Sequence, residues 1–551
     1  MKKKRILFLS EASFLGSGYG VVAKELLVRF HRSKEYDIAE LACYASPENS
    51  QIKDIPWRVY PNMPSEKNED EKKNYHSNPF NQFGLWKWES VCLDFEPDVV
   101  CMYRDHWYDK FVLYSPLRRF YKTIWSPTID AYPLNKEWIS DYTLIDACLT
   151  YTKWGASILK EQCKDKINFC GVATPGANID NFYPIAQKEE VKKQFGIEDD
   201  RIIIGFTARN QIRKLFPELL ENFVILLNQL PKEIADKTYL YFHTTYPDSG
   251  WDFPNLLKEF GLATKVYFTY YCKNCQHIFG SFYKDLYTFC QKCKNFSASI
   301  PSGPQNLISP KFINYIYNIF DIYVQFANCE GLGIPAMEAG AAGIPLMVVN
   351  YSGMCDYVTE TGAIPIKSST YKMDIHTGRF MSIPDKDDFI EKLKNLILMP
   401  STIRRSIGFK IREKIKNKYT WDHCFNIWKQ TVDNLPPNVY KWRENKSYFL
   451  NIPGFNEKPE LNNDQYISWL IHDVFNRPDL MKSYLKLKLL KDLNWRKQKI
   501  SDFGMIWSEE CIMNHISKYK ENIGRKEIFE EILKLVYYHN EWEKNRISKF
   551  K

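Results

Sequence analysis

The stretch DIYVQFANCEGLGIPAMEAG, Asp321–Gly340, decides how the fold of this chain is interpreted, because it combines a strand, a tight turn and a helix. Asp321–Ala327 has the apolar character of a buried strand, and Gly331 and Gly333 make the turn that follows. Pro335 suits the first position of a helix, where its missing N–H is unpaired anyway. Free backbone N–H groups at such a helix start form a binding site for phosphate.

Similar strand-like runs alternate with helical patterns up to about residue 430. The first series comprises Arg5–Ser10, Asp37–Ala45, Asp98–Tyr103, Tyr121–Ser126 and Ile145–Thr150. The second comprises Arg201–Thr207, Tyr239–His243, Lys265–Phe268, Asp321–Phe326 and Pro345–Val349. This alternation predicts parallel sheets covered by helices on both faces. We therefore expect an α/β protein with two Rossmann-like doubly wound domains and a ligand cleft at the carboxyl ends of their strands.

The chain of 551 residues is long enough for more than one domain. We predict an N-terminal domain over residues 1–175 and a C-terminal domain over residues 176–435, joined by the turn-rich segment Thr174–Pro184. Residues 270–304 interrupt the second domain. Residues 436–551 have helical apolar spacing, as at Ile467, Leu470, Ile471 and Val474, and are expected to form a helical extension.

Composition narrows the class of protein. The formal net charge of +9 is mildly basic, which permits an anionic substrate or a nucleic acid without requiring either. The 14 cysteines show no disulfide framework, and no apolar run is long enough to cross a membrane. The apolar run that follows Met1–Arg5 is short and meets Glu11, so it is interpreted as a strand and not as a signal peptide. We expect a cytoplasmic protein.

Two cysteine pairs lie in the insertion. Cys272 and Cys275 form one CxxC pair, and Cys290 and Cys293 form another about fifteen residues later. Four thiolates with this spacing predict a zinc ribbon. Four thiolates leave no open coordination position, so the predicted zinc has a structural role. His277 nearby is expected to be a surface residue.

Glu330 and Glu338 lie eight residues apart, on either side of the glycine turn. This spacing, with the segment around it, resembles the Glu-x7-Glu motif of retaining glycosyltransferases of the GT-B fold, family four in particular. Gly16–Gly20 resembles the family's first glycine loop, Pro175–Pro184 its interdomain segment, and Gly205–Lys214 the loop that holds the donor diphosphate. The resemblance covers residues 1–435.

The resemblance implies roles for residues of the second domain. Arg209 and Lys214 would neutralise the leaving diphosphate, where negative charge develops as the glycosidic bond breaks; Arg213, next to Lys214, is the alternative cation. Glu330 would bind hydroxyls of the donor sugar and Glu338 those of the ribose. Donor binding would also use the close approach allowed by Gly18 and the backbone N–H groups of Gly331, Leu332 and Gly333. No catalytic metal is expected.

In the N-terminal, acceptor-side domain, His106 and Asp130 follow two of the predicted strands. Their position makes them candidate catalytic residues, with a loop histidine and a helix-capping aspartate as the alternative interpretation. The segment Val349–Asp356 departs from the family's usual Gly-Gly-x-Pro-Glu sequence.

The sequence thus predicts a glycosyltransferase that moves a sugar from a UDP-, GDP- or ADP-sugar to an acceptor with retention of configuration. The acceptor, whether glycan, lipid-linked, protein or nucleic acid, and the oligomeric state are not indicated. One alternative is an epimerase or phosphorylase on the same fold. Another is a nucleic-acid-binding or scaffolding protein with an inactive transferase core.

Overall fold

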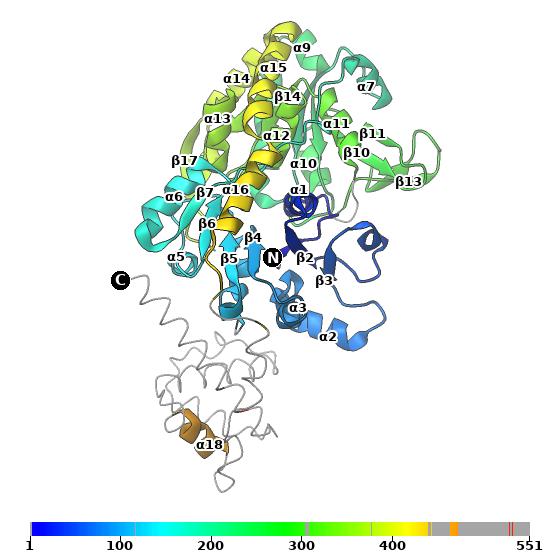
Figure 1. Cartoon of the computed structure of the whole chain (residues 1–551). Coiled ribbons are helices and arrows are strands. Elements are labelled where there is room, and N and C mark those ends of the chain that lie inside the picture. Colours follow the sequence, from blue (N-terminus) through cyan, green and yellow to red (C-terminus); the bar gives the residue numbers. More distant parts are fainter. Residues whose placement is uncertain are drawn as a thin grey trace.

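The computed structural model describes residues 3–115, 117–302, 308–375, 377–438, 442, 463–471, 528 and 532. Within these residues, two sheets, each covered by helices, form two domains (Figure 1). Among the described residues, no helix combines the length and the apolar character needed to cross a bilayer.

The N-terminal sheet has seven parallel strands in the order β3-β2-β1-β4-β5-β6-β7. The strands are β1 Lys4–Glu11, β2 Tyr36–Cys43, β3 Arg58–Pro61, β4 Val99–Met102, β5 Lys122–Trp125, β6 Ala147–Thr150 and β7 Phe169–Val172. The strand order reverses between β1 and β4. Loops that follow these two strands therefore meet at a switch point, which is where doubly wound sheets bind ligands.

The C-terminal sheet contains six parallel strands in the order β10-β9-β8-β14-β15-β16. They are β8 Ile202–Thr207, β9 Thr238–His243, β10 Val266–Cys272, β14 Ile322–Gln325, β15 Leu346–Val349 and β16 Ile364–Ile366. Here the order reverses between β8 and β14. The loops after these two strands contain Arg209–Lys214 and Cys329–Gly333, so the structure brings the two predicted donor-binding segments to one switch point.

Helices connect the strands and cover both sheets. In the N-terminal domain they are α1 Gly18–Ser33, α2 Glu69–Ser77, α3 Trp88–Phe95, α4 His106–Asp109, α5 Lys136–Tyr142 and α6 Lys153–Cys163. The remaining helices are α7 Lys188–Gln194, α8 Phe216–Gln229, α9 Lys232–Lys237, α10 Phe253–Glu259, α11 Pro310–Ile319, α12 Ile334–Ala341, α13 Cys355–Thr361, α14 Lys386–Leu398, α15 Ser401–Lys418, α16 Trp421–Asn434 and α18 Asn463–Trp469.

The helix α16 returns to the N-terminal domain, although it lies inside the range 176–435 (Figure 1). Its Phe425 ring lies 4.9 Å from the Phe30 ring of α1, and its Trp428 ring lies 6.3 Å from the Phe8 ring of β1. The Lys4 ammonium also donates to the Val432 carbonyl at 2.7 Å. The chain therefore crosses between the domains a second time, and this apolar contact packs α16 against the first strand and the first helix.

All the strands predicted from the sequence are present, and the structure adds several that were not predicted. The added β3, β7 and β16 are short, and β3 and β7 are not fully buried, so they lack the apolar runs that revealed the others. A hairpin of β17 Ser368–Met373 and β18 Phe380–Pro384 was also missed, since most of its residues are exposed or partly exposed. Of the predicted helical extension, α18 is described, and the rest lies largely outside the described residues.

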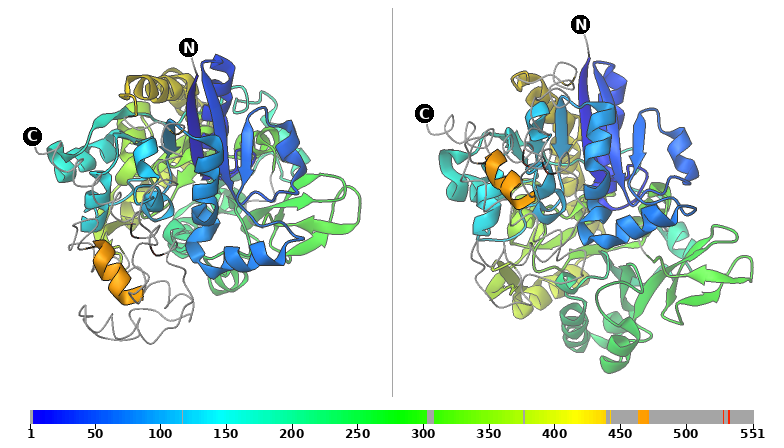
Figure 2. Two further views of the ribbon diagram at one scale, coloured as in Figure 1. Left: turned by 60° about the horizontal axis from the view of Figure 1, so that its bottom comes forward. Right: turned by 90° about the horizontal axis from the view of Figure 1, so that it is seen from below.

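The cysteine-containing insertion extends the C-terminal sheet at one edge. The strands β11 Ile278–Phe282, β12 Tyr287–Phe289 and β13 Phe296–Ser299 follow the end of β10. Both β11 and β13 pair antiparallel with β10, and β12 pairs with β13. Figure 2 shows these strands projecting to one side of the described chain. The insertion thus belongs to the edge of the same sheet whose β8 and β14 precede the predicted donor-binding loops, and not to a separate linker.

Candidate active site

Glu330 is the centre of a buried polar cluster after β14. Its carboxylate accepts from the Arg213 guanidinium at 2.8 Å and from the Gln325 amide at 2.9 Å, and it forms an ion pair with the Lys214 ammonium. The side chains of Lys214 and Glu330 are only 8% and 7% exposed. The Glu330 backbone N–H donates to Ser352 Oγ at 2.9 Å. The cluster therefore holds the carboxylate and two cations in fixed positions.

Arg209 lies apart from this cluster. Its guanidinium makes a two-point contact with Asp248, with nitrogen–oxygen distances of 2.9 and 3.1 Å, and its side chain is 50% exposed. The pairing with Asp248 holds the pKa of Arg209 above its ordinary value, and the pKa of the Asp248 carboxyl below its own. In this structure Glu330 is therefore contacted by Lys214 and by Arg213, the alternative cation. It is not contacted by Arg209.

The glycine turn before α12 brings the two domains together. A Cβ on Gly331 would lie 2.5 Å from Thr128 Cγ2 of the N-terminal domain, so a side chain there would require Thr128 or the turn itself to shift. Gly333 has φ of 83°, a left-handed conformation that favours glycine. Gly18, at the start of α1, is 3.7 Å from Ile334 by the same measure. The structure therefore places the glycine turn, with buried Leu332 between the glycines, against Thr128 in the loop after β5, and the start of α12 next to Gly18.

Glu338 lies one turn into α12, on the C-terminal side of the turn. It accepts a hydrogen bond from the Tyr317 hydroxyl at 2.8 Å. Burial raises the pKa of Glu338 to about 7, although the hydrogen bond from Tyr317 acts in the opposite direction. No cation forms an ion pair with Glu338 within the described part of the chain. A partly buried carboxylate without a counter-charge is costly, which is typical of a residue kept for ligand binding.

The two candidate residues of the N-terminal domain have different surroundings. His106 is buried, with its ring between those of Trp125 and Trp138, and its Nε2 lies 2.6 Å from Asp141. Asp130, in contrast, forms an ion pair with Arg379 and accepts from the Cys329 thiol at 3.7 Å. Asp130 therefore contacts Cys329, the residue next to Glu330. His106 instead lies within the aromatic packing of the N-terminal domain.

Arg379 and Asp105 join this site without having been predicted. Arg379 belongs to the segment between β17 and β18, its side chain is 4% exposed, and its guanidinium lies 4.7 Å from the Trp138 ring centre. Burial, reinforced by the charge of Asp130, raises the pKa of Asp105 to about 7. Position after a predicted strand could have identified Asp105, as it did His106. No sequence signal marked Arg379, because it reaches the site through an exposed hairpin.

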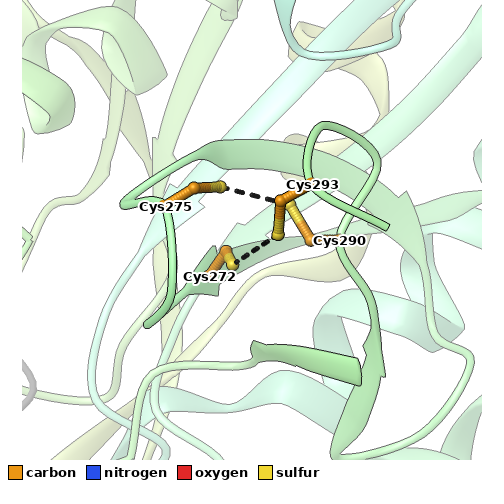
Figure 3. A group of neighbouring side chains, drawn as sticks. All are labelled: Cys272, Cys275, Cys290 and Cys293. Atoms are coloured by element: carbon orange, nitrogen blue, oxygen red, sulfur yellow. Dashed lines mark hydrogen bonds between the residues drawn. The ribbon is translucent and has the colours of Figure 1, made fainter. Parts of the chain in front are cut away.

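The four cysteines of the insertion converge as the sequence predicted (Figure 3). Their sulfurs lie within 4.8 Å of one another, with Cys272 and Cys293 3.7 Å apart and Cys275 and Cys290 3.6 Å apart. Tetrahedral zinc with Zn–S bonds of about 2.3 Å requires sulfurs about 3.8 Å apart. Each pair is followed by a residue with positive φ, Gln276 at 58° and Lys294 at 62°. The donors fit one structural zinc ion, and His277 lies outside the group.

Comparison with known proteins agrees with this arrangement. Residues 307–417 match the family model described as Glycosyl transferases group 1. This group 1 segment ends within α15 and contains both Glu330 and Glu338. The D-inositol 3-phosphate glycosyltransferase of Stackebrandtia nassauensis is 23% identical over 283 residues, which are 50% of this chain and 52% of that protein. The capsular polysaccharide biosynthesis glycosyltransferase CapM of Staphylococcus aureus is 31% identical over 106 residues, 19% of this chain and 23% of that one.

The chain thus spans about half the length of the first relative and about a quarter of the second. Solved structures match more of it. The sucrose-phosphate synthase of Thermosynechococcus elongatus has a TM-score of 0.56 at 13% identity, over 79% of this chain and 99% of that one. Anabaena HepE, solved with UDP and glucose, has a TM-score of 0.51 at 11% identity, over 78% and 100%. The chain therefore contains a segment that matches the group 1 model, and it has the GT-B fold that its sequence resembles.

Proposed function

We propose that this protein transfers a sugar from a nucleotide-sugar donor to an acceptor, with retention of configuration and without a catalytic metal. The observation that carries the proposal is the Glu330 cluster. A buried carboxylate, held by Arg213 and Lys214, lies next to a glycine turn that meets Thr128 of the N-terminal domain. The group 1 segment and the structural likeness to HepE, which was solved with UDP and glucose, support a nucleotide sugar as the donor.

The charges of the cluster suit a diphosphate. Arg213 and Lys214 both contact the one Glu330 carboxylate, and burial holds the pKa of Lys214 well below its ordinary value. A bound diphosphate would favour the charged form of Lys214. Lys214, with Arg209 or Arg213, would stabilise the negative charge that develops on the diphosphate as its bond to the sugar breaks. Glu330 would then accept hydrogen bonds from donor-sugar hydroxyls, and Glu338 from the ribose. Charge-assisted bonds of this type are stronger than neutral ones.

The acceptor would enter from the N-terminal domain, where Asp130 lies. The hydroxyl oxygen of the acceptor would form the new bond to the sugar, on the same face from which the diphosphate leaves. The hydroxyl proton would pass to an oxygen of the diphosphate. This front-face course gives retention without a protein nucleophile. Asp130 and Arg379 would position the acceptor from opposite domains, since their ion pair spans the junction. His106 would support this part of the N-terminal domain, because its ring stacks on Trp138.

The test is a hydrolysis screen of UDP-, GDP- and ADP-sugars, because slow hydrolysis needs no acceptor. We expect one donor to release its nucleoside diphosphate, with the sugar appearing first in the donor's own anomeric form by NMR. Lys214→Ala should lower turnover about 10²-fold. Lys237→Ala is the matched control, because Lys237 precedes β9 at the opposite end of the sheet.

Four results would overturn the proposal. Inverted sugar would refute retention. A new epimer of the sugar nucleotide without release of diphosphate would identify an epimerase, and release only in the presence of inorganic phosphate would identify a phosphorylase. Absence of both hydrolysis and nucleoside diphosphate binding would favour an inactive transferase core.

A further inference from the structure

The outer face of the ribbon carries three exposed aromatic rings. Tyr287, Phe289 and Phe296 are 54%, 65% and 62% exposed. Phe289 pairs with Phe296 across β12 and β13, and their ring centres lie 5.1 Å apart. Tyr287 lies two residues before Phe289, on the same face of the strand. We name these three residues the aromatic face.

These rings do not form the core of the ribbon. Between Tyr287 and Phe289, Thr288 points to the other face and is buried, as is its pairing partner Ala298. The side chains that stabilise the insertion therefore lie on the opposite face and in the cysteine group. Although Phe289 and Phe296 support each other as a cross-strand pair, three aromatic rings exposed on one face form an apolar patch, and such patches mark interaction surfaces.

The same insertion carries four exposed lysines. Lys273, Lys284, Lys292 and Lys294 are exposed, and none forms an ion pair within the described part of the chain. The insertion, residues 270–304, contains no arginine or glutamate, and Asp285 is its single acidic residue. A four-thiolate zinc centre would carry a formal charge of −2. The loaded ribbon then has only a small net positive charge, so its lysines would act through direct contacts and not through a long-range field.

The position of the ribbon places this face at an accessible edge. β12 is the outermost strand of the sheet, and it lies beyond the carboxyl end of β10. Since β10 and β8 run in the same direction, the ribbon that follows β10 and the loop that follows β8 leave the sheet at the same end. The ribbon projects from the side of the sheet (Figure 2).

We propose that the aromatic face and its lysines bind single-stranded nucleic acid. Exposed rings stack on bases without regard to sequence, and neighbouring lysines contact the phosphates. The spacing of Phe289 and Phe296 would let them contact adjacent parts of one strand. A second copy of this chain is a poorer occupant, because it would bring four like charges against these four. The inference stands on the ribbon alone and does not depend on glycosyl transfer.

The experiment measures binding of fluorescein-labelled oligothymidylate to the full, zinc-loaded chain by fluorescence anisotropy. Phe289→Ser and Phe296→Ser should each weaken binding about ten-fold or more. Phe409→Ser, which removes a similarly exposed ring from α15, is the matched control and should leave the affinity unchanged. Zinc content and circular dichroism would establish that each variant is folded.

The salt dependence provides a second readout. If about three lysines contact phosphates, the logarithm of affinity should fall against that of salt concentration with a slope of about −2. The double variant Lys292→Ala, Lys294→Ala should flatten this slope, whereas Lys410→Ala on α15 should not. The proposal is wrong if wild-type protein does not bind the oligonucleotide or the control variants lose as much affinity. It is also wrong if an anionic polysaccharide competes equally well, or if Phe289→Ser instead abolishes a dimer in sedimentation analysis.

Discussion

Replacing Glu338 with glutamine separates a ligand-binding role from a supporting role in α12. Glutamine keeps the shape of the side chain and can still accept the hydrogen bond from the Tyr317 hydroxyl. It loses the negative charge, which burial opposes strongly enough to raise the pKa of Glu338 to about 7 from an ordinary 4.5. The variant therefore removes an electrostatic cost from the ligand-free protein.

The magnitude follows from that pKa. A difference between 4.5 and about 7 corresponds to about 3 kcal/mol when the carboxylate is fully ionised. Because the folded pKa is raised, the folded protein binds more protons than the unfolded chain between these pH values. The contribution of Glu338 to stability therefore falls as pH rises from 4.5 to about 7, and its full cost is present above that window.

We expect Glu338→Gln to melt at a higher temperature than the wild type at about pH 8 and at the same temperature near pH 4.5. A domain of this size gains about 2–4 °C per kcal/mol. Its affinity for nucleoside diphosphate should fall about ten- to a hundred-fold, because one or two charge-assisted bonds from ribose hydroxyls are lost. Wild-type affinity should also weaken as pH falls below about 7, where Glu338 takes up its proton.

Scanning calorimetry across pH measures the first effect, and isothermal titration calorimetry with UDP, GDP and ADP measures the second. Glu391→Gln, an exposed change on α14, is the matched control. A lower melting temperature together with unchanged diphosphate affinity would refute the reasoning, because that combination is what a purely supporting carboxylate predicts.

Four further outcomes are expected. Purified protein should carry about one zinc ion per chain by elemental analysis, and Cys272→Ser should lose both the ion and folding of the ribbon; metal-free protein never exposed to a chelator would contradict this. Arg209→Ala should lower donor turnover about 10²-fold with little change in melting temperature; wild-type turnover would transfer its role to Arg213. Glu330→Gln should impair transfer while nucleoside diphosphate still binds, and equal loss of both would refute its assignment to the sugar. Turnover should persist in EDTA, and loss that magnesium alone restores would show a catalytic metal.

Much of the fold could be predicted because its strands are buried on both faces. β1, β8 and β14 appear in the sequence as continuous apolar runs, since a parallel sheet covered by helices leaves little exposed side-chain surface. The glycine turn before α12 was recognisable for a local reason. Gly333 adopts a left-handed conformation that few other residues tolerate, so the backbone itself restricts the residue type.

The cysteine group was also determined by the sequence, because ligand chemistry and short spacing are local. The two CxxC pairs lie on one short insertion, so each pair can meet only the other. The structure brings the four sulfurs within 4.8 Å of one another. The hairpin of β17 and β18 could not be found in this way. Its strands are largely exposed and lack an apolar pattern, and its existence depends on pairing between residues that the sequence does not mark.

What only the tertiary structure decided is the set of partners of each charged side chain. The sequence placed Arg209, Arg213 and Lys214 on one loop but could not say that Asp248 pairs with the first and Glu330 with the other two. The same holds for Arg379, which meets Asp130 from 249 residues away. Such pairings depend on how the strands are ordered and how the two domains approach each other. Neither can be predicted from residue type or local spacing, because a charged side chain pairs with residues that are close in space but distant in the sequence.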